Sequence, residues 1–316
     1  MIWGDRMKYL VLACLLGALT PAFAAECGAL QTISSVALES STDHLREHVP
    51  VKINGTPLKL ILDTGGYTSQ LTPETVSALN LPVGGALGGM KFIGSSNNKL
   101  QSVTITDFQM GSMHAANLPM LVNTMPGLGK EAAGLLAGDL FLAYDLDMDF
   151  GNDKLNFISS DHCPGKVVYW HADVVAEVPL RIVNGHYLIN VTLDGKRLIA
   201  LLDTGAPHSS IGMAEASRYF DLSAASPDMQ PGAKVNGTVA RYNHKFGTLA
   251  FEGIEVHDLT IAVLETSELD RERPAYGARI VGGVVHNSDM ILGMDVMRHF
   301  HIYIATQERK VYITPK

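Results

Sequence analysis

A seven-residue stretch that occurs twice constrains the fold of this chain more than any other feature. Residues 60–66 read Leu-Ile-Leu-Asp-Thr-Gly-Gly, and residues 200–206 read Ala-Leu-Leu-Asp-Thr-Gly-Ala, 140 positions later. In each copy an apolar run ends in one carboxylate, one hydroxyl and one glycine. A carboxylate at the rim of a core costs free energy unless it has a partner or a function. Two copies in register therefore predict two carboxylates, Asp63 and Asp203, that face each other.

The likeness between the two halves extends beyond this stretch. An Asn-Gly pair at 54–55 and an Asp-Gly pair at 194–195 each separate two apolar runs, which is typical of a β-hairpin. Short helices are expected at 73–79 and 213–219, and alternating strands close each half. An internal repeat at this spacing indicates two copies of one domain. We predict an all-β fold with short helices, built as two lobes in a pseudo-twofold arrangement.

The predicted organisation has five parts, with the boundary between the lobes near the Cys-Pro-Gly sequence at 163–165. They are a signal peptide at 1–24, an N-terminal segment at 25–46, a first lobe at 47–162, a linker at 163–177 and a second lobe at 178–316.

Carboxylates at two further places have predicted structural roles. Asp139 and Asp295 each stand at the start of a short apolar segment, where we expect them to cap a helix. Asp145, Asp147 and Asp149 alternate with apolar residues in the closing strand of the first half. We expect this acidic face to be solvated.

The first 24 residues have the composition of a secretory signal peptide. Arg6 and Lys8 precede an apolar run at 9–19, and Ala-Phe-Ala at 22–24 provides a small-residue cleavage site. The run is too short to cross a bilayer, and no later segment reaches about 18 apolar residues. We expect an exported protein, periplasmic or secreted, without stable membrane insertion.

Removal of the signal peptide leaves two cysteines, Cys27 and Cys163. In an oxidising compartment they allow a single disulfide, and two unpaired thiols are the alternative. We predict the disulfide, in a structural role. In the chain-entropy model, closing a loop of this length contributes roughly 4–5 kcal/mol to stability.

Charge and motif content argue against several functional classes. The formal net charge is −8 and no cluster of Lys and Arg is present, so a nucleic-acid partner is not expected. The 12 histidines show no metal-ligand spacing, and we expect neither a metal nor another cofactor. No Gly-x-Ser-x-Gly sequence supports a serine hydrolase.

The duplicated turn supports acid–base chemistry if the two copies pack about a pseudo-twofold axis. Asp63 and Asp203 would then share a proton and titrate as a pair. Such a pair can hold a water, take a proton from it and give one to a carbonyl oxygen. Supporting roles fall to Thr64, Gly65, Thr204 and Gly205. The threonine hydroxyls can lock the two turns together, and the glycines let backbone amides approach the carboxylates. A plain strand-end turn is the alternative reading of the motif.

These residues resemble the aspartic proteases of the retroviral type, the retropepsin-like family. The resemblance consists of an apolar-Asp-Thr-Gly turn followed downstream by apolar-apolar-Gly, here at 136–138 and 291–293. It covers nearly all of residues 47–316, twice, so the chain is similar to a fused dimer. It implies a monomer that acts as an intramolecular pseudo-dimer. It also implies hydrolysis of peptide or unfolded-protein substrates by an activated water, with no metal and no covalent intermediate.

The resemblance further implies glycine-rich flaps that close over the peptide. The candidates, from one stretch in each half, are Gly89, Met90, Lys91, Phe92, Gly94, Asn236, Gly237 and Tyr242. Ordinary surface hairpins are the alternative. The first copy departs from the family pattern at two positions, since Gly66 stands where Ala or Ser is common and Ala137 replaces a larger apolar residue.

A second function remains open on the sequence alone. The chain could be an exported module without catalytic activity, one that binds peptide or an envelope polymer in the same cleft between the lobes. An extended ligand would then add to the strand edges.

Overall fold

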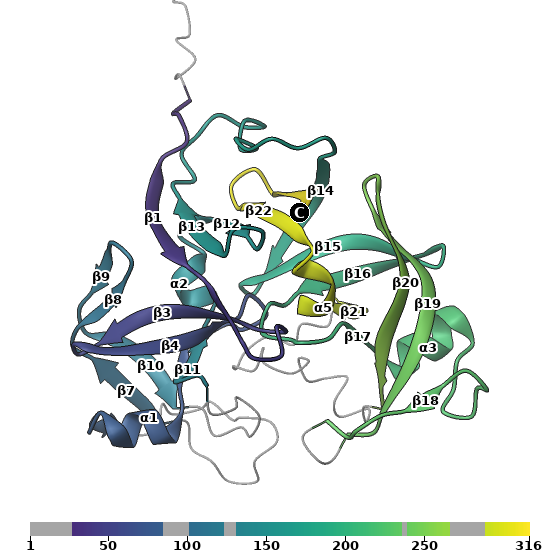
Figure 1. The fold of residues 1–316 in the computed structure, drawn as a ribbon, viewed down its shortest axis with the longest axis horizontal. Coiled ribbons are helices and arrows are strands. Elements are labelled where there is room, and N and C mark those ends of the chain that lie inside the picture. The colour runs from purple at the N-terminus through teal and green to yellow at the C-terminus, as the bar shows by residue number, and fades with distance from the viewer. Residues whose placement is uncertain (1–26, 85–100, 123–130, 236–238, 266–287) are drawn as a thin grey trace, which may run out of the picture.

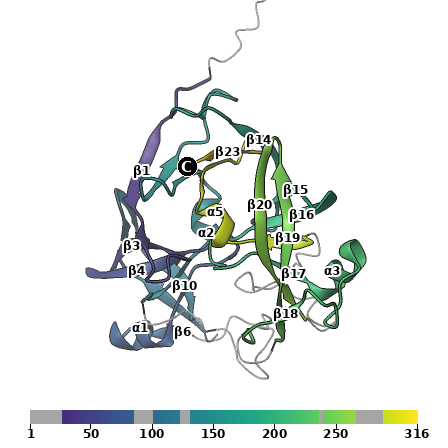
Figure 2. The same ribbon diagram turned by 45° about the vertical axis from the view of Figure 1, so that its right-hand side comes forward.

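The computed structural model describes residues 27–84, 101–122, 131–235, 239–265 and 288–316. Two β-sheets make up most of this part of the chain, and only short helices accompany them. The strands of the first half and the long strands of the second half form two lobes, and the C-terminal strands lie between them (Figures 1 and 2). The all-β, two-lobed fold predicted from the sequence is confirmed.

The first sheet has ten strands, all from the first half of the chain, in the order β6-β7-β10-β5-β11-β4-β3-β8-β9 with β2 paired to β3. Their bounds are β2 (Glu39–Ser40), β3 (Glu47–Ile53), β4 (Thr56–Leu62), β5 (Gln70–Leu71), β6 (Val83–Gly84), β7 (Ser102–Ile105), β8 (Phe108–Met110), β9 (Met113–Ala115), β10 (Leu118–Val122) and β11 (Gly134–Leu136). Two helices belong to this lobe, α1 (Pro73–Ala78) and α2 (Gly138–Phe141).

The second sheet has 13 strands and runs through both lobes, in the order β1-β13-β12-β22-β23-β14-β15-β16-β21-β17-β20-β19-β18. Their bounds are β1 (Thr32–Ala37), β12 (Asp145–Asp149), β13 (Lys154–Ile158), β14 (Ala176–Val183), β15 (His186–Leu193), β16 (Lys196–Leu202), β17 (Ser210–Gly212), β18 (Gln230–Pro231), β19 (Arg241–Phe251), β20 (Ile254–Leu264), β21 (Met290–Leu292), β22 (Phe300–Ala305) and β23 (Lys310–Pro315). The helices α3 (Met213–Phe220) and α5 (Met294–Met297) complete the second lobe.

Local turn chemistry explains the hairpins that lead into the duplicated motif. The turn between β3 and β4 has φ angles of 50° at Asn54 and 80° at Gly55, and the turn between β15 and β16 has 42° at Asp194 and 75° at Gly195. Positive φ at both central residues is what a two-residue type I′ hairpin requires, and Asn, Asp and Gly tolerate it best. Both predicted hairpins are confirmed.

The lobes are joined where β12 of the first half pairs antiparallel with β22 of the second. Leu146 lies opposite Ile304 and Met148 opposite Ile302, and at most 1% of each of these side chains is exposed. They belong to one continuous apolar core that extends through both lobes. The predicted apolar face of β12 is therefore confirmed, and it holds the two lobes together.

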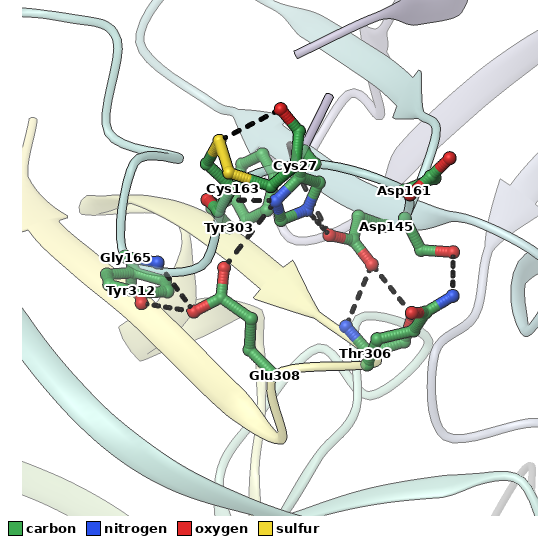
Figure 3. Close-up of polar contacts among 12 residues, drawn as sticks. Cys27, Asp145, Asp161, Cys163, Gly165, Tyr303, Thr306, Glu308 and Tyr312 are labelled. Carbon is green, nitrogen blue, oxygen red and sulfur yellow. Dashed lines mark hydrogen bonds and ion pairs between the residues drawn. A yellow bond between two sulfur atoms is a disulfide. The ribbon is translucent and has the colours of Figure 1, made fainter. Parts of the chain in front are cut away.

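The acidic face of β12 is not solvated, so that prediction was wrong. Asp145 is buried and accepts hydrogen bonds from the Thr306 amide (2.8 Å), the Thr306 hydroxyl (2.7 Å) and the Tyr303 hydroxyl (3.3 Å) (Figure 3). His162 Nε2 lies 2.6 Å from its second oxygen. Strand alternation fixes the side to which a residue points, but segments distant in sequence decide what covers that side.

Asp147 is buried in the same way, two residues along the strand. It accepts hydrogen bonds from Asn156 Nδ2 (2.8 Å) and from the Tyr169 hydroxyl, and His301 Nε2 lies 2.5 Å from its other oxygen. Trp170 stacks on the His301 ring with 3.7 Å between the ring centroids. His301 thus packs inside the molecule and links the two lobes through a carboxylate.

Cys27 and Cys163 are joined by a disulfide, with their Cα atoms 4.7 Å apart (Figure 3). The bond ties the chain ahead of β1 to the segment that follows His162, beside the Asp145 contacts. In the described part of the chain, no helix is long and apolar enough to cross a membrane.

Candidate active site

The two Asp-Thr-Gly turns lie at equivalent places in the two lobes. Strands β4 and β16 end directly before Asp63 and Asp203, and each runs parallel to a short strand of its own lobe, β11 or β21. The Asp63 amide donates to the Leu136 carbonyl (2.9 Å), and the Asp203 amide donates to the Leu292 carbonyl (3.0 Å). The backbone of each lobe therefore fixes the direction in which its aspartate leaves the strand.

Hydrogen bonds between Thr64 and Thr204 hold the two turns to each other. Each threonine amide donates to the hydroxyl of the other threonine, at 3.0 and 3.1 Å. Each hydroxyl donates in turn to the opposite lobe, from Thr64 to the Leu202 carbonyl (2.9 Å) and from Thr204 to the Leu62 carbonyl (2.7 Å). Both threonines are fully buried. Four reciprocal hydrogen bonds thus fix the spacing between the turns.

The carboxyl groups of Asp63 and Asp203 contact each other between the turns. A Cβ atom on Gly65 would collide with the Asp203 carboxyl group, and one on Gly205 would lie 2.6 Å from Asp63 Cγ. Each carboxyl group therefore lies against the glycine of the opposite turn. Any residue larger than glycine at either position would push the pair apart.

Burial dominates the electrostatics of this pair, since only 1% of each aspartate is exposed. Asp203 Oδ1 accepts hydrogen bonds from the amides of Gly205 (2.9 Å) and Ala206 (3.1 Å). The other three carboxyl oxygens have no hydrogen bond of good geometry with any described residue. Burial raises the pKa of Asp63 to about 6, although the nearby Gly66 and Gly65 amides oppose it. Burial and the charge of Asp63 raise the pKa of Asp203 well above its usual value.

Two serine–aspartate pairs support the turns, and they correct the predicted helix caps. The caps of α2 and α5 are Ala137 and Gly293, and neither makes a side-chain cap hydrogen bond. Asp139 instead accepts hydrogen bonds from the Ser69 amide (3.0 Å) and hydroxyl (2.7 Å). In the second lobe, Asp295 accepts from the amide (2.8 Å) and hydroxyl (2.7 Å) of the equivalent serine, Ser209. Each carboxylate therefore anchors the chain that leaves the Asp-Thr-Gly turn of its own lobe.

The sequence did not single out Arg46 and His186, which act on the paired turns. Burial raises the pKa of Asp63, and the positive charge of Arg46 opposes this. Burial lowers the pKa of His186, and the main chain of Gly65 opposes this shift. The two residues are 140 positions apart, the same spacing as the aspartates, so the repeat itself contained the signal.

Most of the flap candidates lie outside the described residues: Gly89, Met90, Lys91, Phe92, Gly94, Asn236 and Gly237. Tyr242 is described and lies on β19, where it pairs with Val263. Val235 and Val239 form a short antiparallel bridge just ahead of it. Among the described residues, no group of three or more His, Cys, Asp or Glu side chains could hold a metal ion.

Comparison with known proteins places this geometry in a family. The model of the aspartyl protease family matches residues 49–140 and again 189–296. A solved retropepsin-like aspartic protease from Rickettsia conorii is 20% identical with a TM-score of 0.29, over 41% of this chain and 92% of that one. Conglutin gamma, a basic 7S globulin from lupine seeds, is 12% identical with a TM-score of 0.48, over 91% and 95%. No curated protein matches the chain.

Both TM-scores lie below 0.5, so neither structure is used to assign the family. The match to the family model assigns it, because the two matched segments together cover more than half of the chain and each contains one Asp-Thr-Gly turn. The chain therefore belongs to the aspartyl protease family and carries two copies of the family's domain in one polypeptide.

Proposed function

We propose that this protein is an aspartic endopeptidase, which hydrolyses peptide bonds with a water activated by Asp63 and Asp203. One observation carries the proposal: two buried carboxyl groups touch at the junction of two turns that reciprocal hydrogen bonds hold in place. Structural carboxylates in a core are normally satisfied by donors or cations, whereas three of the four oxygens of this pair have no hydrogen-bond partner among the described residues. Unsatisfied, desolvated acids with raised pKa values are typical of catalytic sites.

The raised pKa values supply the protonation state that the chemistry needs. Two contacting carboxylates that are shielded from bulk solvent retain a proton between them at a pH where exposed aspartates have none. The ionised carboxylate takes a proton from the attacking water, and the other carboxyl group gives its proton to the carbonyl oxygen of the peptide. When the tetrahedral intermediate collapses, the C–N bond breaks, a proton passes from the pair to the leaving nitrogen, and one hydroxyl of the intermediate returns its proton to the pair. Positioned acid–base help of this kind contributes on the order of 10²–10⁴ in rate.

The setting we propose is an exported one, periplasmic or secreted, with peptides or unfolded proteins as substrates. The Cys27–Cys163 disulfide supports an oxidising compartment. A single chain suffices as an intramolecular pseudo-dimer, because each lobe contributes one aspartate and one threonine to the site.

The test is cleavage of an unfolded protein by the purified mature chain, followed at pH 3 to 8. The proposal expects peptide products from the wild type and their loss in Asp63→Asn and Asp203→Asn. Both variants should keep the circular dichroism spectrum and cooperative melting of the wild type. The alternative, a peptide-binding module, is tested in the same samples by fluorescence anisotropy. Binding of labelled peptide without cleavage at any pH would overturn the protease proposal.

A further inference from the structure

A cavity of about 340 Å³ is lined by residues from both halves of the chain. Glu47, Phe150 and Asp153 contribute to it from the first lobe, and Arg298 and Lys316 from the second. No residue of either Asp-Thr-Gly turn is part of the lining. Since a water takes up about 30 Å³ in the liquid, the space suits a molecule of roughly ten non-hydrogen atoms. The cavity is therefore large enough for a small organic ligand.

Four charged side chains line this cavity, two of each sign: Glu47, Asp153, Arg298 and Lys316. Among the described residues, no ion pair joins either of these carboxylates to either of these cations. Opposite charges that line one space without direct contact leave room for a ligand that pairs with both signs. The balance of two and two disfavours a ligand with one sign of charge only.

Glu47 lies at the buried end of the cavity, with 5% of the residue exposed, whereas Asp153 and Lys316 are exposed. A single hydroxyl, that of Ser40, serves both of its oxygens, at 2.9 and 3.1 Å. Burial raises the pKa of Glu47, as does the charge of Asp153, whereas the charges of Arg298 and Lys316 oppose this. All four charges therefore act within one space. A buried carboxylate with so few donors is stabilised by a cationic partner.

Arg298 is held in place beside this space. It is the C-cap residue of α5, and its Nη1 donates to the His44 carbonyl at 2.8 Å. The bond connects the second lobe to the chain just ahead of β3. It uses one of the five N–H donors of a guanidinium, and a planar carboxylate suits the others. The cavity thus offers a fixed donor group for the acidic end of a ligand.

The pseudo-twofold equivalents of these residues show that the fold does not need the charges. Tyr187 stands 140 positions after Glu47 and is fully buried. Leu142 is the C-cap residue of α2, as Arg298 is of α5. An aromatic and an aliphatic side chain therefore take the places that a carboxylate and a guanidinium have at the cavity. Because the repeat can be built with apolar residues here, the charged lining points to a ligand.

We propose that this cavity binds a short zwitterionic peptide of about dipeptide size. Its ammonium group pairs with Glu47 and Asp153. Its carboxylate pairs with Arg298 and Lys316. A simple anion would meet two carboxylates and a simple cation two basic groups, so a ligand with both charges is preferred. The bound peptide contacts both lobes and stabilises the folded chain by mass action. The inference does not depend on the protease function.

The first experiment titrates alanyl-alanine into the mature chain, with ¹H–¹⁵N NMR shifts and Tm as readouts. Two matched probes each lack one charge: N-acetyl-alanyl-alanine keeps only the carboxylate, and alanyl-alanine amide keeps only the ammonium group. We expect the dipeptide to bind and to raise Tm, and each matched probe to bind at least about tenfold more weakly. Equal affinities for the three probes, or no binding of the dipeptide at millimolar concentration, would overturn the proposal.

Variants then locate the bound dipeptide. Glu47→Gln should weaken binding by more than about tenfold, and the exposed changes Asp153→Asn and Lys316→Gln by roughly three- to tenfold each. Asp221→Asn is the matched control for Asp153→Asn, because both aspartates are exposed and have φ angles of 56° and 52°. It should keep the wild-type affinity, as should Asp203→Asn. Should Glu47→Gln not fold, the two exposed changes decide. Loss of binding in Asp203→Asn but not in these two would place the dipeptide at the paired turns and refute the proposal.

Discussion

Two pairs of buried aspartates lie between the lobes of this protein, and they differ in the number of hydrogen-bond donors around their carboxyl groups. Asp145 and Asp147 on β12 are at most 1% exposed, and each has at least three donor groups around its carboxylate. Asp63 and Asp203 are equally buried, yet three of their four carboxyl oxygens have no such partner in the described part of the chain. Burial alone therefore does not distinguish the two pairs. The number of hydrogen-bond donors that the described residues provide does.

The donors of the β12 pair come largely from the second lobe. Thr306, Tyr303 and His301 all approach the two carboxylates from β22 or just beyond it. The fold therefore uses satisfied carboxylates to fasten the lobes together at one place. At the Asp-Thr-Gly turns, hydrogen bonds of the threonines hold the lobes together, and Asp63 and Asp203 have few donors among the described residues.

The largest expected effect distinguishes the two pairs by activity. Asp203→Asn removes one half of the proton-sharing pair, so kcat/KM for an unfolded substrate should fall by about 10²–10⁴-fold. Asp145→Asn leaves the carboxyl pair intact and should keep kcat/KM within about threefold when the rates are normalised to folded protein. Initial rates of peptide release measure both. Equal losses in the two variants would contradict a division between catalytic and structural aspartates.

The second prediction concerns stability, and here replacement of the β12 aspartate should have the large effect. Asp145→Asn places an amide where the Thr306 and Tyr303 donors and His162 surround a carboxylate, and should lower the free energy of unfolding by about 3 kcal/mol. Urea titration at neutral pH measures this. Asp149→Asn is the control on the same strand, because Asp149 is only half-buried, bonds within its own turn and otherwise lies no closer than 3.9 Å to His301 Nδ1. It should cost less than about 1 kcal/mol.

The difference between the pairs also shows what sequence patterns could and could not predict. The hairpins at Asn54-Gly55 and Asp194-Gly195 follow from local turn chemistry, and the repeat predicted that Asp63 and Asp203 are equivalent. The burial of Asp145 was missed because its cover comes from residues up to 161 positions away. His186 was missed because nothing in its own stretch distinguishes it, and only its register with Arg46 relates it to the site.

A third test concerns the threonines that hold the unsatisfied pair in place. Thr204→Val keeps the shape of the side chain but removes its hydroxyl, which leaves the Thr64 amide and the Leu62 carbonyl buried without their partner. The free energy of unfolding should fall by about 2 kcal/mol. Thr64→Val should cost a similar amount, because its hydrogen bonds match those of Thr204.

The double variant sharpens that test. The two threonines share one network, so the combined loss should be smaller than the sum of the single losses. Thr56→Val, at an exposed position of β4, should stay within about 0.5 kcal/mol of the wild type. Additive losses would mean that the two hydroxyls act separately and do not form one brace between the lobes.

The smallest expected effect is the pH dependence that Asp63 and Asp203 contribute to stability. Burial raises the pKa of Asp63 to about 6, above its value in the unfolded chain, so the folded state binds more protons between about pH 4 and pH 6. Stability contributed by this group must therefore rise as the pH falls, by roughly 1 kcal/mol from pH 7 to pH 5. The raised pKa of Asp203 acts in the same direction. Replacement of both aspartates by Asn removes the titrating groups. Urea titrations at pH 7, 6 and 5 should therefore show that the free energy of unfolding of the wild type increases at each step relative to that of the double variant. Parallel curves would mean that the two carboxyl groups titrate as if solvated, and the contrast with the satisfied aspartates of β12 would then lose its physical basis.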